Sequence, residues 1–283
     1  MVERWGAALG EGQLDCELFN GAKMSCDLAH YIERQIYYFG AFEIVEAYLF
    51  RAMLTRGMVV VDAGANVGQY SLIAAAGIGV EGEVHAFEPE PTNFTRLLRH
   101  IQHNHSDQVI RANKAALWRS DGRLNLALRP EFTGNPGAYS VVESGQHGDA
   151  QSCQAVRLDD YARENRLRRL DMVKMDIEGS ELMALQGAAE VIARWHPTIF
   201  MELSRLTCRN LGYRPELLLE YLIGYGYQAW LIDNNPEGCR PITSLDGVDL
   251  GNVIFHTEPL PRVVTAGWSL RSILSQRRAL PPA

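Results

Sequence analysis

The sequence contains few cysteines, no long hydrophobic run and no excess of positive charge. Its five cysteines are widely separated and include no C-x-x-C pair, which argues against a disulfide framework and against a zinc knuckle. We expect each of them to be a small buried hydrophobe. The longest uninterrupted apolar stretch, from Leu72 to Val80, is about half as long as the roughly 20 residues of a transmembrane helix, so we expect no membrane span.

The charge balance is acidic, with 34 acidic and 27 basic side chains and a formal net charge of −7. This sign disfavours a protein that binds nucleic-acid phosphates over a broad surface. The chain starts without a basic segment followed by an apolar one, so we expect no secretory signal and a cytoplasmic location. Four arginines and no acidic residue follow Glu258. We expect residues 259–283 to form a basic tail that packs on its own domain or docks an acidic carrier protein, a membrane surface or another subunit.

Apolar strand patterns alternate with amphipathic helical patterns along the middle of the chain. We predict strands over 58–62, 83–87, 109–110, 171–175 and 198–201, and helices over 92–103, 180–193 and 215–224. This alternation predicts an α/β fold with a mainly parallel sheet and helices on both faces. Two later strand patterns, at 227–232 and 252–256, predict a closing antiparallel hairpin.

The remaining segments predict the organisation around this core. Residues 1–50 carry much of a helical pattern that runs over 29–54, and we expect an N-terminal helical cap on a core of residues 51–258. A polar, glycine-rich region predicts a short strand at 124–128 and a variable loop at about 129–152. A loop of this length is more often a lid or a binding loop than an inert connection.

A glycine turn follows the first strand of this core, which ends at Asp62. Gly64 and Gly68 flank small residues, and a helix is predicted to follow. Glycine permits positive φ and a close ligand approach, and the N–H groups of a helix start can bond polar ligand atoms. A dinucleotide site needs G-x-G-x-x-G, but Asn66 stands where the second glycine would be. The spacing instead resembles motif I of class I S-adenosylmethionine (SAM) methyltransferases, in which Asp62 would organise the turn or contact the cofactor.

A second acidic residue, Glu88, follows the next predicted strand in the segment His85–Pro89. A carboxylate at the carboxyl end of this strand can accept hydrogen bonds from both hydroxyls of a ribose. An isolated Glu after a strand is more often solvated at the surface. Because this one follows the glycine turn at a suitable distance, we predict that Glu88 binds the ribose.

Together with a later K-x-D-x-E-G segment, these motifs resemble the FkbM-type methyltransferases, a SAM-dependent family that mostly methylates oxygen. The likeness covers roughly residues 36 to 203, and Val173–Gly179 is its most specific part. It rests on the segments Tyr37–Glu43, Val61–Gly68, Ala86–Pro89, Asn113–Leu117, Leu158–Tyr161, Val173–Gly179 with Glu181, and Pro197–Glu202. The resemblance implies a class I Rossmann-like fold with a mostly parallel seven-stranded sheet.

The motifs and the resemblance together predict which residues surround SAM. The predicted cofactor contacts are Glu43, Asp62, Gly64, Ala65, Asn66, Gly68, Tyr70, Ser71, Glu88, Pro89, Asn113, Ala115 and Asp176. The resemblance also places the segment from Tyr37 over the cofactor and a serine, here Ser140, near the active site. We expect Tyr37 and Ser140 to contact the substrate.

Four carboxylates stand at the carboxyl ends of predicted strands, where open α/β sheets bind their ligands: Asp62, Glu88, Asp176 and Glu202. Methyl transfer to a hydroxyl needs an aligned nucleophile and a base, and a carboxylate with a pKa near 4 is a weak base for an alcohol. Crowding of Asp176, Glu178 and Glu202 would raise one of these pKa values. We assign Asp176 or Glu178 the base and orienting role.

Other readings of the same acidic residues stay open. Lys174 would be a charge partner that tunes the carboxylates, or part of a buried network that only shapes the strand end. Three nearby carboxylates are also able to hold one Mg²⁺, although we predict no dedicated metal ligands. His100, His103 and His105 form a cluster near the end of a helix, and we expect a solvated helix end rather than a metal site.

We therefore predict a SAM-dependent O-methyltransferase that acts on a hydroxyl of a sugar or secondary metabolite, in natural-product biosynthesis. The substrate class follows from the resemblance alone and includes acceptors bound to an acyl or peptidyl carrier protein. The alternatives are an N-methyltransferase of small molecules, an NAD-dependent oxidoreductase and a non-catalytic SAM-binding protein. An RNA methyltransferase is disfavoured by the acidic balance. The oligomeric state stays open, with a homodimer as one option.

Overall fold

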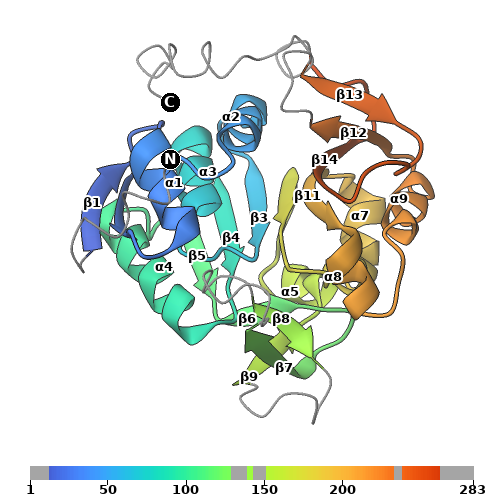
Figure 1. Ribbon diagram of the computed structural model, residues 1–283, viewed down its shortest axis with the longest axis horizontal. Helices are drawn as coiled ribbons and strands as arrows, with labels where there is room; N and C mark the ends of the chain where they lie inside the picture. The colour runs from blue at the N-terminus through green and yellow to red at the C-terminus, as the bar shows by residue number, and fades with distance from the viewer. Residues whose placement is uncertain (1–12, 129–138, 143–150, 233–237, 262–283) are drawn as a thin grey trace.

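A computed structural model describes residues 13–128, 139–142, 151–232 and 238–261. Its centre is an eight-stranded sheet with helices on both faces (Figure 1). The strands are β1 Gln13–Glu17, β2 Lys23–Asp27, β3 Val59–Ala63, β4 Glu83–Phe87, β5 Ile110–Asn113, β6 Ala115–Leu117, β7 Gly122–Leu128, β8 Tyr139–Val142, β9 Gln151–Val156, β10 Met172–Met175, β11 Thr198–Ser204, β12 Gln228–Ile232, β13 Cys239–Ile242 and β14 Leu250–His256. The helices are α1 Tyr31–Phe39, α2 Ile44–Met53, α3 Gln69–Ile78, α4 Pro91–His103, α5 Leu158–Glu164, α6 Glu181–Gln186, α7 Ala189–Trp195, α8 Arg205–Asn210 and α9 Glu216–Ile223.

The strand order across the sheet is β13-β12-β14-β11-β10-β3-β4-β5. The pairs from β11 to β5 are parallel, and β14 lies antiparallel between β11 and β12. The expected class I Rossmann-like fold with an antiparallel closing pair is therefore confirmed. The structure has one strand more than the expected seven, because β13 extends the sheet at the edge of β12.

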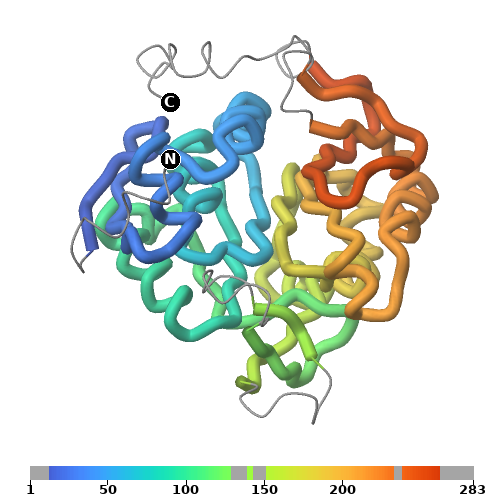
Figure 2. Tube along the Cα trace, in the orientation of Figure 1, coloured from blue at the N-terminus to red at the C-terminus, as the bar shows by residue number. Residues whose placement is uncertain are grey.

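The central strands are buried on both faces, as expected when helices cover a parallel sheet on both sides. All five residues of β3 are buried, and its four apolar residues are divided between two apolar clusters. Val60 belongs to the cluster formed with α1 to α4, whereas Val59 and Val61 belong to the cluster formed with α5 to α9. Figure 2 shows the same division, with the blue and cyan first part of the chain on one side and the yellow and orange part on the other.

Two smaller sheets flank the central one. β1 and β2 form a hairpin, and β6, β9, β7 and β8 form a four-stranded sheet that lies between β5 and α5 in the chain. The strand predicted at 124–128 is confirmed as part of β7, but the other strands of these two sheets were not predicted. The loop segments 129–138 and 143–150, and the basic tail from residue 262 onward, lie outside the described residues.

Two helical patterns are interrupted in the structure. The pattern over 29–54 forms α1 and α2, because Gly40 ends α1 with a φ of 79° and Glu43 precedes α2 with a φ of 49°. Residue 50 lies inside α2, and the division into cap and core stays a prediction. The pattern over 180–193 forms α6 and α7, which are separated near Gly187. A Cβ at Gly187 would lie 2.0 Å from the carbonyl oxygen of Trp118.

The prediction that His100 belongs to a solvated helix end was wrong. Its side chain is buried between α4 and the N-terminal segment. Nδ1 contacts the carbonyl oxygen of Val67 at 2.7 Å, and Nε2 accepts the N–H of Ser25 at 3.1 Å. Because a carbonyl needs a donor and an N–H needs an acceptor, these partners specify the neutral tautomer protonated at Nδ1. Burial lowers the pKa of His100, which also favours the neutral form.

All five cysteines are free thiols, and four of them are buried. The Sγ atoms of Cys16 and Cys26 nevertheless lie 3.1 Å apart across the hairpin, a proximity that their sequence spacing did not predict. Within the described ranges, every helix is too short or too polar to cross a membrane.

Candidate active site

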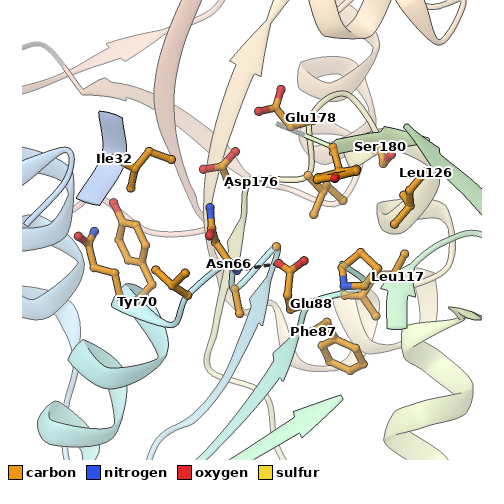
Figure 3. Close-up of a pocket in the computed structure, with 18 of the residues that line it drawn as sticks. Ile32, Asn66, Tyr70, Phe87, Glu88, Leu117, Leu126, Asp176, Glu178 and Ser180 are labelled. Atoms are coloured by element: carbon orange, nitrogen blue, oxygen red, sulfur yellow. Dashed lines mark hydrogen bonds between the residues drawn. The ribbon is translucent and has the colours of Figure 1, made fainter. Parts of the chain in front are cut away.

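A pocket lies at the carboxyl edge of the central sheet, where the loops after β3, β4 and β10 meet (Figure 3). Tyr70 and Ile32 stand at one end of this pocket, and Leu117 and Leu126 stand at the other. Its described lining is Ile32, Ile36, Phe42, Gly64, Ala65, Asn66, Val67, Gln69, Tyr70, Phe87, Glu88, Pro89, Ala116, Leu117, Leu126, Tyr139, Val141, Asp176, Ile177, Glu178 and Ser180. We call it the cofactor pocket, because it contains much of the predicted SAM-binding set.

The two positions of the turn after β3 that carry glycine require it for different structural reasons. Gly64 has a φ of +76°, and a Cβ there would lie 2.0 Å from the carbonyl oxygen of Asp176. Gly68 has a φ of +102° and is the N-cap of α3, with a Cβ position 2.7 Å from Leu97. Glycine is therefore required at both positions by the protein's own packing and backbone conformation.

The N–H groups of the glycine turn are largely used inside the protein. Gly64 and Ala65 both donate to the carbonyl oxygen of Phe87, and Gly68 donates to that of Ala65. Asn66 donates its N–H to the carboxylate of Glu88. These four N–H groups are therefore occupied within the protein, and the expectation for the N–H groups at the start of α3 stays a prediction.

Glu88 follows β4 and is 5% exposed. Its Oε2 accepts the N–H of Asn66 and its Oε1 accepts the N–H of Glu90, both at 2.8 Å. Each carboxylate oxygen has a second lone pair, so the group is held in one orientation and can still accept two further hydrogen bonds. Burial raises the pKa of Glu88 to about 7, against the lowering effect of the two N–H donors.

Asp62 lies beneath the turn and does not line the cofactor pocket. It is 1% exposed, and its Oδ2 accepts a 2.5 Å hydrogen bond from the hydroxyl of Ser71 in α3. Burial raises the pKa of Asp62 to about 6. Of the two roles predicted for Asp62, the structure supports organisation of the turn, because its partner is the first turn of α3.

A buried cation, Lys174 of β10, lies behind the pocket. Its Nζ is 3.6 Å from Oδ2 of Asp176 and 4.8 Å from the centre of the Tyr70 ring, and it has no hydrogen-bond acceptor among the described residues. Burial alone would lower the pKa of Lys174, but the charges of Asp176, Glu43, Glu202 and Asp62 raise it. Lys174 is therefore the positive centre of a carboxylate cluster, as its predicted role as a charge partner requires.

The predicted crowding of carboxylates is present and acts most strongly on Glu202. Burial, together with the charges of Asp176 and Glu178, raises the pKa of Glu202 to about 9. Burial also raises the pKa of Glu43 to about 7, although Lys174 opposes the shift. Both shifts favour the protonated forms of Glu202 and Glu43.

The loop that carries Asp176 and Glu178 is shaped by Glu181. Oε1 of Glu181 accepts the N–H groups of Ile177 and Gly179, both at 3.2 Å. Glu178 has a φ of 54° and Gly179 a φ of 98°, so the chain turns sharply between β10 and α6. This turn brings Glu178 into the lining of the cofactor pocket, which strand alternation alone did not decide.

A second pocket lies beside the cofactor pocket and shares Phe42 with it. Its described lining is Tyr31, Gln35, Phe39, Ala41, Phe42, Glu43, Ile44, Val45, Glu46, Glu202, Leu231, Ile232, Arg240, Gly247, Val248, Leu250, Gly251 and Asn252. Two of the predicted site residues, Glu43 and Glu202, are in this second pocket. The N-terminal segment and the closing strands build it, and neither carried a motif for it in the sequence.

Several predicted residues lie outside both pockets. Seven of the predicted cofactor contacts line the cofactor pocket: Gly64, Ala65, Asn66, Tyr70, Glu88, Pro89 and Asp176. Seven predicted residues of the cofactor set or the substrate set are absent from the described lining of both pockets: Asp62, Gly68, Ser71, Asn113, Ala115, Tyr37 and Ser140. Ser140 is buried in β8, and its neighbours Tyr139 and Val141 line the cofactor pocket instead. The roles assigned to these residues stay predictions.

Two polar residues of the cofactor pocket were missed in the sequence. Ser180 is 3% exposed, and its Oγ has no hydrogen-bond partner within the described structure. The side chain of Gln69 accepts the N–H of Phe42 at 2.7 Å and donates to the carbonyl oxygen of Phe42 at 3.0 Å. These two hydrogen bonds hold Phe42, which lines both pockets, in position. Gln69 stands within the glycine-turn segment, but its partner is 27 positions away, so spacing gave no signal.

A metal site finds no support in these side chains. The described residues contain no group of three or more His, Cys, Asp or Glu side chains arranged to hold a metal ion. The suggested Mg²⁺ therefore has no ligand set in the described part of the chain.

The family assignment comes from comparison with known proteins. A family model described as the methyltransferase FkbM domain matches residues 62–229, more than half of the chain. The chain belongs to the FkbM methyltransferase domain family. This assignment agrees with the resemblance found in the motifs, and the match includes Asp62, Glu88 and the segment after β10.

The chain is similar to methyltransferases from several organisms. The chain is 30% identical to "Methyltransferase 1" of Beauveria bassiana over 144 residues, which are 45% of this chain and 57% of that protein. It is 29% identical to the "31-O-demethyl-FK506 methyltransferase FkbM" of Streptomyces tacrolimicus (48% of this chain, 62% of that protein). It is 24% identical to the "Hexuronic acid methyltransferase AglP" of Haloferax volcanii (46% and 50%). These matches span about half to three fifths of the relatives' own length.

Among solved structures, the chain is similar to a methyltransferase FkbM from Methylobacillus flagellatus KT. The sequence identity is 21% and the TM-score is 0.44, with 75% of this chain and 48% of that chain covered.

Proposed function

We propose that this protein is a SAM-dependent methyltransferase that methylates a hydroxyl group of a sugar or secondary metabolite. The observation that carries the proposal is Glu88, a carboxylate held by two backbone N–H groups at the end of β4 in a chain of the FkbM family. Its free lone pairs suit the two hydroxyls of a ribose. Asp176 lies in the same pocket, at the end of β10.

The side chains of the cofactor pocket fit the parts of SAM. Phe87, Leu117 and Leu126 give the side of Glu88 away from Tyr70 an apolar lining suited to the adenine. The unpartnered hydroxyl of Ser180 offers a hydrogen bond that the protein leaves unused. The carboxylate cluster around Lys174 favours a positive charge near Asp176, as a sulfonium requires. When bound, SAM supplies the activated methyl group.

The carboxylates divide the remaining work in this proposal. Asp176 and Glu178 line the cofactor pocket and take the base and orienting roles for the acceptor hydroxyl. Lys174 holds Asp176 in place through their 3.6 Å ion pair. Glu202, whose pKa burial raises, orients the acceptor as a hydrogen-bond donor in its protonated form rather than as a base.

Transfer to oxygen is supported by relatives whose names state a hydroxyl or sugar substrate. One relative is named for 31-O-demethyl-FK506 and another for a hexuronic acid. We extend oxygen methylation to this chain on that basis. Carrier-bound acceptors and a role in natural-product biosynthesis stay part of the proposal.

The test separates cofactor binding from methyl transfer. Isothermal titration with S-adenosylhomocysteine measures the affinity of wild type, Glu88→Gln and Asp176→Asn, and NAD serves as the competing ligand. We expect binding of S-adenosylhomocysteine and no binding of NAD. Glu88→Gln should lower the affinity about 10- to 100-fold, since a lost hydrogen bond to a charged group costs about 1.5–3 kcal/mol.

Transfer from radiolabelled SAM to a panel of sugars and hydroxylated metabolites then tests the assigned base. At saturating SAM, Asp176→Asn or Glu178→Gln should lower turnover about 10²-fold or more, because general-base catalysis contributes that much. Near-wild-type turnover in both variants would remove the base role. Binding of S-adenosylhomocysteine without transfer to any acceptor would instead indicate a non-catalytic SAM-binding protein.

A further inference from the structure

The second pocket is separated from the cofactor pocket by two adjacent residues. Phe42 lines both pockets, and Glu43 lines the second one. The carboxylate of Glu43 lies 3.5 Å from the hydroxyl of Tyr70, which lines the cofactor pocket at the end away from Leu117. Asn252 of β14 donates to the same carboxylate at 3.1 Å. The two pockets therefore meet at the Phe42–Glu43 wall.

The lining of the second pocket combines apolar and acidic side chains. Tyr31 and Phe39 of α1 and Leu231 and Ile232 of β12 supply apolar surface. Glu43, Glu46 and Glu202 supply its carboxyl groups. Arg240, which is exposed, is the single Lys or Arg in the described lining. The pocket thus offers both hydrogen-bonding carboxyl groups and apolar contact.

We propose that this second pocket binds the methyl acceptor, and that the acceptor is an uncharged or cationic hydroxyl compound with an apolar face rather than an anionic sugar. The inference rests on the function proposed above and specifies the substrate class of the same site. It distinguishes this protein from a relative named for a hexuronic acid. We call this cavity the acceptor pocket.

The charge and the shape of the pocket both support an uncharged or cationic acceptor with an apolar face. A carboxylate on the acceptor would lie beside three protein carboxyl groups that are buried or half-buried, and the exposed Arg240 is the single Lys or Arg in the described lining that could offset its charge. Burial raises the pKa of Glu43, Glu46 and Glu202. The site therefore disfavours the negatively charged form of a carboxyl group, which applies equally to a carboxylate on the acceptor. The ring of Tyr31 packs edge-on against Phe42, with centroids 6.2 Å apart, and together they extend the apolar surface to the boundary with the cofactor pocket.

A matched pair of amphiphilic sugars tests the proposal. Octyl β-D-glucopyranoside and octyl β-D-glucuronide differ in one carboxylate, and each is titrated below its micelle-forming concentration into the protein saturated with S-adenosylhomocysteine. We expect the glucoside to bind at least tenfold more tightly than the glucuronide. Equal or tighter binding of the glucuronide, or no binding of the glucoside, would overturn the proposal.

Two substitutions at exposed positions locate the binding without disturbing the core. Tyr31 is 47% exposed in α1, and Tyr31→Ala should weaken glucoside binding at least fivefold. The matched control is Tyr38→Ala, on the same helix but outside the described lining. This control should change the affinity for the glucoside less than twofold. Equal effects of the two substitutions would place the glucoside elsewhere and overturn the assignment.

A charge introduced at the rim tests selectivity. Leu250 lines the acceptor pocket and is 65% exposed, so Leu250→Arg adds a cation without loss of a buried side chain. It should lower the ratio of glucuronide to glucoside dissociation constants at least threefold, whereas Val80→Arg, at an 86% exposed position distant in sequence, should not. An unchanged ratio in Leu250→Arg would count against the electrostatic basis. If the wild-type protein does not bind S-adenosylhomocysteine, the proposed function itself is contradicted. Failure of the proposed function is therefore distinguishable from failure of the acceptor-pocket proposal, which the sugar titrations measure.

Discussion

At the scale of single residues, the site depends on close contacts between its own loops. The backbone after β3 passes against the carbonyl group of Asp176, and only a glycine at position 64 leaves room for it. The same contact places Asp176 beside Ala65 and Asn66 in the cofactor pocket. A glycine of a binding motif thus serves the packing of two loops as well as access for a ligand.

This contact predicts a large effect of Gly64→Ala. The new Cβ would lie 2.0 Å from a carbonyl oxygen at a φ of +76°, so backbone strain and overpacking add up, and we expect about 2–5 kcal/mol of lost stability. Urea unfolding measures it. Gly57→Ala is the control, because Gly57 has a φ of +75° with no atom near its Cβ position and should cost only about 1–2 kcal/mol. Equal losses in the two variants would show that the clash is relieved.

Sequence motifs were informative for residues that stand next to a strand end. Glu88 and Asp176 were predicted in this way, and both line the cofactor pocket. Ser180 was missed as a pocket residue, and Phe42 lay in the segment Tyr37–Glu43 that the resemblance places over the cofactor, without a predicted contact of its own. Their positions depend on the turn shaped by Glu181 and on the clamp from Gln69, which are contacts in space.

At the scale of elements, the N-terminal hairpin and α1 are attached to α4 by a buried ion pair. The carboxylate of Glu33 accepts hydrogen bonds from the guanidinium of Arg96, from the N–H of Asp27 and from His30. Burial alone would raise the pKa of Glu33, but Arg96 and the N–H of Asp27 lower it overall. Arg96 also donates to the carbonyl oxygen of Ser25 in β2. Because α1 lines both pockets, this attachment also positions their apolar walls.

Removal of one member of this pair should be strongly destabilising. Glu33→Ala leaves the buried charge of Arg96 uncompensated, and we expect a loss of about 3–5 kcal/mol in the free energy of unfolding. The exposed pair Arg214–Glu220 is the control, and Glu220→Ala should cost less than about 1 kcal/mol. The double variant Glu33→Ala/Arg96→Ala should lose less than the sum of the single changes. Strict additivity would mean that the two side chains are not coupled.

The predicted elements differ in how well periodicity located them. The strand predicted at 83–87 coincides with β4, and α4 agrees with its predicted helix within one residue, because both have strong local patterns. The helix over 180–193 was predicted as one element, since the apolar spacing continues through Gly187. The structure divides it into α6 and α7 near Gly187, where Trp118 leaves no room for a Cβ, and local periodicity contains no information on such a contact.

At the scale of the whole molecule, many carboxyl groups are buried near the carboxyl edge of the sheet. Burial is the first cause of raised pKa values at five of them: about 6 for Asp62, about 7 for Glu43, Glu88 and Glu181, and about 9 for Glu202. The folded protein therefore binds more protons than the unfolded chain between about pH 4.5 and pH 9. A cationic cofactor would offset part of this electrostatic cost.

The ligand-free protein should consequently lose stability as the pH rises. A carboxyl group with a raised pKa in the folded state stabilises the fold where it is protonated, and this contribution disappears as the pH rises through the folded pKa. We expect a melting temperature several degrees lower at pH 8.5 than at pH 6, measured by scanning fluorimetry at constant ionic strength. Glu202→Gln should make the decrease smaller. A melting temperature that is constant or rises over this interval would contradict the assignment of raised pKa values.

The sequence by itself determined the fold class, the central strands and the carboxylates at their ends, because burial on both faces and strand-end motifs leave local patterns. Tertiary structure alone decided which of these residues share a pocket, that His100 is buried and that an acceptor pocket forms between α1 and the closing strands. Its two walls are about 200 positions apart in the chain, at Tyr31 and Leu231. No local sequence pattern predicts that residues so far apart in the chain lie close together, since their proximity depends on how the whole sheet and its helices pack.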